Sequence, residues 1–183
     1  MATVRISDGS LCYERVGDGP TIPFVRGIFG DADAWTNQAA RLSDGHTCVR
    51  YDRRGYTRST RGADMVTDAA ALIETLGLAP CLVVGSSSGA LITVDVALRH
   101  HRLLRGVVLS EPPLFNLDPR AGHAFMSELA SRIDEAMATR GPPAGVDARF
   151  GSGHVTYAEQ PDEFENAAPV FAAELGRRTT ASA

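Results

Sequence analysis

Residues 83–90 read Val-Val-Gly-Ser-Ser-Ser-Gly-Ala and place a Gly-x-Ser-x-Gly motif between an apolar strand and a helix. A nucleophilic serine in such a motif sits on a tight strand-to-helix turn, which lifts its hydroxyl clear of the sheet. Gly85 and Gly89 are small enough to let the neighbouring backbone pass close to the turn. The free amides at the start of the following helix favour developing negative charge. The motif therefore predicts Ser87 as a nucleophile.

Two other interpretations of this stretch stay open at this point. A serine-rich loop matches Gly-x-Ser-x-Gly by chance fairly often. A phosphate-binding glycine loop normally follows the first strand of its unit and carries a third glycine. Here Leu91 stands where that glycine is wanted, and no Gly-Lys-Ser/Thr occurs. The position between a buried strand and a helix favours the nucleophile turn.

The rest of the chain alternates strand and helix patterns. Alternating or apolar runs predict strands at residues 3–6, 11–16, 21–26, 46–51, 81–84, 105–109 and, at the end, 146–150. Helices are predicted at residues 31–42, 63–76, 88–100, 119–140 and 161–176. Asp31 or Asp33 can cap the first of them, and apolar spacing of three and four marks those at 63–76 and 119–140. This rhythm is that of an α/β protein, with a mostly parallel sheet and helices on both faces.

Composition predicts a single globular domain over residues 1–183, with 44% hydrophobic and 22% charged residues. The net charge is −4 and no basic stripe occurs, which argues against a nucleic-acid partner. No apolar run is long enough for a membrane span, and the N-terminus lacks an apolar signal core, so we expect a cytoplasmic protein. Cys12, Cys48 and Cys81 form no CxxC pair, so we expect buried free thiols and no metal site.

Three further segments, taken with the Ser87 turn, resemble the signature segments of the α/β-hydrolase fold superfamily in their usual order. Residues 24–30, Phe-Val-Arg-Gly-Ile-Phe-Gly, resemble the strand and His-Gly-x-x-Gly loop that supplies one oxyanion donor. Residues 51–59 resemble the Asp-x-Arg-Gly-x-Gly-x-Ser loop, and residues 151–164 resemble the segment that carries the catalytic histidine. The resemblance implies a compact α/β-hydrolase-like fold with a reduced cap.

The chain departs from that family in three places. Family members carry a helical cap after the sixth strand and then a seventh strand that ends in the acid of the triad. Too few residues separate Leu109 from His154 for all of this, so a strand–acid–helix unit is missing. Residues 119–145 are then a remnant of the cap or a connecting helix. Arg26 replaces the usual histidine and Thr57 a usual glycine, which leaves the geometry of both loops open.

A serine hydroxyl needs a base, held in turn by a carboxylate. The resemblance implies His154 as the base, in a Gly-Ser-Gly-His loop, and the other histidines are interpreted as structural. Glu111 is the first candidate for the acid because some members of the fold carry it after the sixth strand. Asp147 is the second candidate. A Ser–His dyad, or no activity at all, stays open.

The oxyanion hole is expected at the backbone amides of Ser88 and Ile28. Gly27 belongs to the same loop, and Phe29 is expected to wall the pocket. A reaction that uses a serine nucleophile and a histidine base needs neither a metal nor another cofactor, so none is expected. Three nearby residues are interpreted as loop braces or core, and these are Asp52, Arg53 and Trp35.

The resemblance implies a serine hydrolase that acts on a small ester, lactone or related carbonyl substrate through an acyl-enzyme. A serine at the nucleophile position argues against epoxide hydrolase or haloalkane dehalogenase chemistry, which the fold performs with a carboxylate. One alternative is a truncated or non-catalytic scaffold, whose exposed sheet edge and apolar surface favour a homodimer. The other is non-hydrolytic use of the same site, such as perhydrolysis or a biosynthetic cleavage. The expected partner is a small molecule, with no nucleic acid and no membrane.

Overall fold

The computed structural model describes residues 1–7, 9–28, 31–60, 65–113, 118–120, 122–124, 127, 130, 131, 135 and 138. Its described strands form one mixed sheet in the order β1-β2-β4-β3-β5-β6. The strands are β1 (Ala2–Ile6), β2 (Gly9–Val16), β3 (Thr21–Val25), β4 (Thr47–Tyr51), β5 (Cys81–Ser86) and β6 (Leu104–Ser110). The pairs β3–β4, β3–β5 and β5–β6 are parallel, whereas β2 is antiparallel to both β1 and β4. The prediction of a mostly parallel sheet after an opening hairpin is confirmed.

The described helices between the strands also lie where the sequence predicts them. They are η1 (Ala32–Trp35), α1 (Thr36–Leu42), α2 (Met65–Thr75), α3 (Ser88–Arg99) and η2 (His101–Leu103). The helix predicted over residues 31–42 is divided, because its first turn is a tighter 3₁₀ turn. The Asp31 carboxylate caps that turn by accepting from the Asp33 amide at 2.9 Å.

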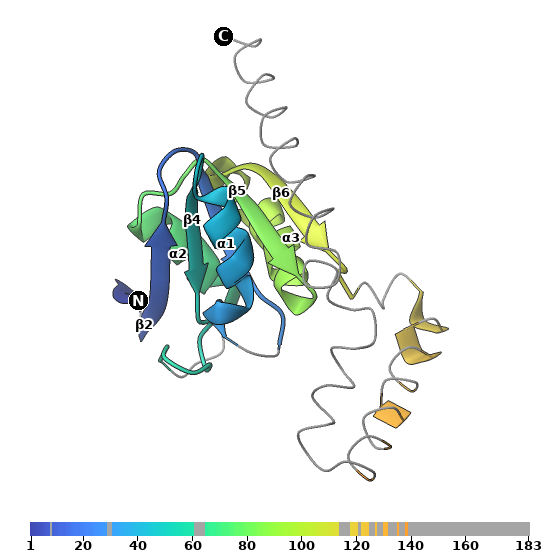
Figure 1. Cartoon of the computed structure of the whole chain (residues 1–183). Coiled ribbons are helices and arrows are strands. Elements are labelled where there is room, and N and C mark those ends of the chain that lie inside the picture. The colour runs from blue at the N-terminus through green and yellow to red at the C-terminus, as the bar shows by residue number, and fades with distance from the viewer. Residues whose placement is uncertain are drawn as a thin grey trace.

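Helix α1 lies on one face of the sheet and α2 and α3 lie on the other (Figure 1), and each face carries one apolar cluster. Neighbouring strand residues such as Phe24 and Val25 belong to opposite clusters, as a side-chain period of two requires. The smaller cluster lies under α1 and contains Ile22, Phe24, Trp35, Ala39, Leu42, Cys48 and Val84. Trp35 is fully buried with its ring 5.0 Å from that of Phe24, so the core role expected for it is confirmed.

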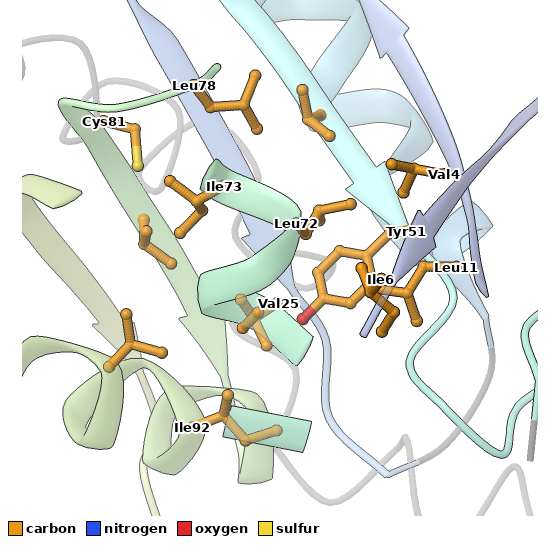
Figure 2. Packing of buried hydrophobic residues seen from close by; sticks show 14 residues of the cluster. Val4, Ile6, Leu11, Val25, Tyr51, Leu72, Ile73, Leu78, Cys81 and Ile92 are labelled. Carbon is orange, nitrogen blue, oxygen red and sulfur yellow. The ribbon is translucent and has the colours of Figure 1, made fainter. Parts of the chain in front are cut away.

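The larger cluster lies between the sheet and the pair α2 and α3. Figure 2 shows Leu72 and Ile73 of α2, Ile92 of α3 and the strand residue Val25 as members of this cluster. Fully burying one such aliphatic side chain stabilises the fold by about 1.5–3 kcal/mol. This cluster therefore fixes the start of α3, and with it the turn that precedes α3.

Strand β6 is the last strand of the described sheet, and its side chains are mostly only half-buried. Leu109 is 38% exposed. The described residues within 119–138 are helical, as predicted for that range. The strand predicted at residues 146–150 and the helix predicted at 161–176 lie outside the described residues. Within the part of the chain that the structure describes, no helix combines the length and apolar character needed to cross a bilayer.

Candidate active site

Four loops meet at the carboxyl edge of the parallel strands. Gly27 comes shortly after β3, Asp52 follows β4, Ser87 follows β5 and Glu111 follows β6. Because these strands run in the same direction, their carboxyl ends lie at one edge of the sheet, where α/β proteins bind ligands. The described candidate residues that follow these strands therefore lie at one edge of the sheet.

Ser87 adopts a strained backbone conformation between β5 and α3. Its φ of 53° and ψ of −125° lie in a region that residues with a side chain rarely occupy. Such a conformation costs on the order of 1–3 kcal/mol and persists only where the surrounding structure enforces it. The strained strand-to-helix turn that the motif predicts at Ser87 is confirmed.

The two glycines of the motif allow close backbone packing around this turn. A Cβ atom on Gly85 would lie 2.3 Å from the Thr93 hydroxyl oxygen and 2.6 Å from the Gly89 carbonyl oxygen. A Cβ atom on Gly89 would lie 2.1 Å from the Val25 carbonyl oxygen. Any larger residue at either position would therefore push α3 away from β5 or β3.

The loop after β3 lies directly against Ser87. A Cβ atom built on Gly27 would be 3.1 Å from the Ser87 Cβ and 3.6 Å from the Ser87 hydroxyl oxygen. Ile28 follows and is 50% exposed. The Ser88 amide is the first of α3, and amides of a first helical turn have no acceptor within the helix. The structure thus places Gly27 against Ser87, with Ile28 and Ser88 as the next residues of the two segments, whereas Phe29 lies outside the described residues.

The segment after β6 also contacts the turn. The Ser87 amide donates to the Ser110 carbonyl oxygen at 2.9 Å, and Glu111 is the next residue. Glu111 is half-buried, with a positive φ of 48°. The structure therefore places the first candidate acid in the segment bonded to the candidate nucleophile. His154 and Asp147 lie outside the described residues.

The loop after β4 is held by ion pairs. Asp52 is fully buried and accepts from the Ala32 amide at 2.8 Å and from the Arg58 Nε at 2.5 Å. Burial alone would raise the pKa of Asp52, but these hydrogen bonds reverse that effect and hold the pKa below its ordinary value. Arg54 is paired with buried Asp68 in the same region. The bracing role expected for Asp52 is confirmed.

Thr57 occupies the position of this loop where the family resemblance expects a glycine. Its φ of 33° keeps the left-handed conformation that glycine adopts more readily. The loop still closes, because the Ser59 hydroxyl donates to the Asp52 carbonyl oxygen at 2.6 Å. The substitution of glycine by threonine therefore retains the turn.

Two buried arginines lie around one tyrosine ring beside the candidate nucleophile, and sequence reasoning missed this cluster. The guanidinium carbons of Arg26 and Arg53 lie 4.7 and 4.8 Å from the centre of the Tyr56 ring. Arg53 also donates to the Ser88 hydroxyl at 3.1 Å. Burial, and then repulsion from Arg53, lower the pKa of Arg26. Arg26 in place of a histidine was the one sequence signal of the cluster.

The cysteines take no part in the site. Cys12, Cys48 and Cys81 are buried free thiols, as predicted. Burial raises the pKa of Cys48 and Cys81 to about 12, so neither supplies a thiolate near neutral pH. Among the residues that the structure describes, no group of three metal-ligating side chains is found.

Comparison with known proteins decides the family. The family described as alpha/beta hydrolase fold matches residues 20–140, which include the Ser87 turn and the loops after β3 and β4. The chain belongs to the α/β-hydrolase fold family. The fold expected from the four sequence segments is thereby confirmed.

This α/β-hydrolase chain aligns with only part of each of the relatives named here. It is 34% identical over 139 residues to "Uncharacterized hydrolase YraK" of Bacillus subtilis, covering 69% of this chain and 51% of that protein. A Vigna radiata epoxide hydrolase mutant matches with a TM-score of 0.58 at 26% identity, over 61% of this chain and 38% of that one. A mutant of the meta-cleavage product hydrolase CumD has a TM-score of 0.58 at 18% identity over 61% and 45%, which shows the fold alone. The chain spans about half the length of YraK.

Proposed function

We propose that this protein is a serine hydrolase that cleaves a small ester, lactone or related carbonyl compound through an acyl-enzyme. The observation that carries the proposal is the conformation of Ser87, with φ 53° on the turn between β5 and α3. A strained serine at this point of the α/β-hydrolase fold presents its hydroxyl at the edge of the sheet where substrates bind. The neighbouring Gly27 supports the proposal because even a Cβ atom added there would contact that hydroxyl.

The proposed reaction has two steps with balanced bonds. The Ser87 oxygen attacks the substrate carbonyl carbon while His154 takes the hydroxyl proton, and the tetrahedral oxyanion accepts hydrogen bonds from the Ser88 and Ile28 amides. Collapse breaks the bond to the leaving alcohol, which receives the proton from His154. A water molecule then attacks the acyl-enzyme and gives its proton to His154. Collapse breaks the bond between the acyl carbon and the Ser87 oxygen, which receives that proton from His154, so the acid and the free serine are released. In this scheme Glu111 orients His154.

The identity of the nucleophile distinguishes the proposed reaction from epoxide hydrolysis, the activity named for one structural neighbour. One neighbour is named an epoxide hydrolase. Epoxide hydrolases of this fold attack with a carboxylate, whereas residue 87 of this chain is a serine. A serine forms a carboxylic ester with an acyl group, and water can hydrolyse that ester. We therefore assign acyl transfer to water rather than epoxide opening.

The test is covalent labelling by a fluorophosphonate probe, which reacts with activated serines. The native chain is compared with Ser87→Ala, His154→Ala and Glu111→Gln, and with Ser86→Ala as a matched control one residue away. We expect no labelling of Ser87→Ala, strong loss in His154→Ala and a further graded loss in Glu111→Gln. Labelling of Ser86→Ala should equal that of the native chain. A folded native chain that is not labelled overturns the proposal.

A second candidate function is an associating scaffold, and strand β6 favours it. This strand ends the described sheet and leaves Leu109 38% exposed. An open edge with apolar side chains is a template for pairing with another chain. Sedimentation of the same samples separates the two functions: dimers without labelling support the scaffold, and labelled monomers support the hydrolase. Labelling without ester turnover would indicate non-hydrolytic use of the site.

A further inference from the structure

Arg53 is a buried cation whose hydrogen-bond partners, within the described part of the chain, are two neutral hydroxyl groups. It is 2% exposed and donates to the Ser88 hydroxyl at 3.1 Å and to the Tyr56 hydroxyl at 3.0 Å. Among the residues that the structure describes, its Nε has no hydrogen-bond acceptor and no carboxylate forms an ion pair with it. Burying a guanidinium without an opposite charge costs several kcal/mol. The buried charge of Arg53 would therefore be stabilised by an anion that forms at this place during a reaction.

Other arginines of the same region show what a purely structural arginine looks like here. Arg50 pairs with Glu14 and Asp33, and Arg54 pairs with Asp68. Arg54 is 3% exposed, so it is as buried as its neighbour Arg53, yet its charge is matched. Burial alone thus does not explain why no carboxylate of the described residues pairs with Arg53.

A second cation increases the positive potential at this place. The Arg26 guanidinium lies over the same Tyr56 ring as that of Arg53. Arg53 helps to lower the pKa of Arg26, which reflects repulsion between the two cations, and Tyr56 partly offsets it. The fold therefore concentrates positive charge beside the start of α3.

The hydrogen bond from Arg53 to Ser88 connects this charge to the turn. Ser88 follows the strained Ser87 and provides the first amide of α3. In the reaction proposed above, that amide donates to the oxyanion. A fixed positive charge acts more strongly on an oxyanion in a buried site than in water. We propose that Arg53 is a positioning residue of the oxyanion hole, which anchors Ser88 and places a positive charge behind its amide. This inference rests on the proposed function.

Three variants separate the charge of Arg53 from its bond to Ser88. Arg53→Met removes both, whereas Arg53→Lys keeps the charge without the two-pronged donor geometry. Ser88→Ala removes the acceptor hydroxyl and keeps the amide and the arginine. Arg54→Lys is the matched control, because it alters an equally buried arginine that contacts Asp68 instead.

The experiment measures kcat and KM for p-nitrophenyl acetate and the rate of fluorophosphonate labelling, with folding checked by circular dichroism. Loss of one direct oxyanion donor lowers kcat by about 10²–10³-fold, so we expect about 10-fold for the indirect Arg53→Met and less for Ser88→Ala. KM should change little, and Arg53→Lys should recover part of the rate. If His154 acts as the base at Ser87, as proposed above, the acid limb of the kcat–pH profile should move to higher pH in Arg53→Met, because a cation beside the site lowers the pKa of the base. Arg54→Lys should change neither kcat nor this limb.

The possible results distinguish failure of the proposed role of Arg53 from failure of the proposed hydrolase function. A native chain that neither turns over nor is labelled overturns both. A reactive native chain with unchanged kcat in folded Arg53→Lys and Ser88→Ala overturns the inference alone. These two variants keep the test decisive if Arg53→Met fails to fold. A fall in thermal stability with kcat and the pH profile unchanged assigns Arg53 a structural role and also overturns it.

Discussion

The loop after β4 and the turn after β5 lie at the same edge of the sheet but are stabilised in different ways. In the loop after β4, buried carboxylates are matched by arginines, with Asp52 bonded to Arg58 and Asp68 to Arg54. In the turn after β5, backbone atoms approach so closely that only glycine fits beside them, and Ser87 is strained.

The difference teaches which changes each region tolerates. The loop after β4 should respond to charge and pH, because its stability comes from ionised groups. The turn after β5 should respond to volume and backbone conformation. Arg53 belongs to the first region by sequence and to the second by its bond to Ser88, which makes it the physical link between them.

The largest effect is expected at the buried ion pair of the loop after β4. Arg54→Met leaves the Asp68 carboxylate, which is 2% exposed, without its bidentate partner. We expect the free energy of unfolding to fall by about 3–5 kcal/mol, the cost of an uncompensated buried charge. Urea denaturation followed by Trp35 fluorescence measures it. The double variant Arg54→Met/Asp68→Leu should recover most of the loss, and a single variant within about 1 kcal/mol of the native chain would contradict the comparison.

The second effect is a pH-dependent contribution from Asp52. Asp52→Asn keeps an acceptor for the Ala32 amide but removes the charge-assisted bonds from Arg58, so we expect a loss of about 1.5–3 kcal/mol at pH 7. The folded pKa of Asp52 lies below its ordinary value of 3.8. Its stabilisation is therefore fully present above that value and is lost as the pH falls through the folded pKa.

Urea titrations at several pH values test this sign. The difference between Asp52→Asn and the native chain should be constant from pH 7 to about pH 5 and should shrink below about pH 4. A difference that stays the same down to the acid limit of folding would show that ionisation of Asp52 does not contribute.

Much of this fold could be predicted from the sequence because its signals are local. The strand and helix ranges follow from spacing along the chain, and the turn at Ser87 follows from two glycines flanking one serine. The contact between Arg53 and Ser88 could not be predicted, because it joins residues 35 positions apart and depends on how β4 and β5 are placed in the sheet. Likewise, the apolar sequence of β6 does not reveal that this strand lies at the end of the described sheet.

The third effect tests the close packing of the turn after β5. Gly89→Ala adds a Cβ atom that would lie 2.1 Å and 2.5 Å from the carbonyl oxygens of Val25 and Arg26. Both contacts are with backbone, so α3 must move, and we expect a loss of about 1–3 kcal/mol together with slower labelling of Ser87. Gly45→Ala is the control, because nothing lies within 4 Å of the added atom. Its stability should change by less than about 0.5 kcal/mol. Equal stabilities of the two variants would show that α3 shifts freely.

The smallest effect separates the strain at Ser87 from its hydroxyl. Ser87→Ala and Ser87→Gly both remove the nucleophile, so both should lose fluorophosphonate labelling. Only glycine adopts a φ of 53° with a ψ of −125° without strain. Ser87→Gly therefore removes the backbone strain, but glycine also gives the unfolded chain more conformational freedom, which offsets part of this gain. We expect Ser87→Gly to be more stable than Ser87→Ala by about 1 kcal/mol. Thermal unfolding of both variants measures the difference.

Ser43 supplies the control, since it has an ordinary helical φ of −68°. There the order should reverse, with Ser43→Ala more stable than Ser43→Gly, because glycine brings only its entropy cost. If alanine is also the more stable residue at position 87, the turn holds no strain, and its conformation loses its value as the sign of a nucleophile. If glycine is the more stable residue there, the chain gives up stability at the one point where a hydroxyl must leave the sheet. The ion pairs of the loop after β4 carry no such loss of stability, because their charges stabilise the fold that holds the turn in place.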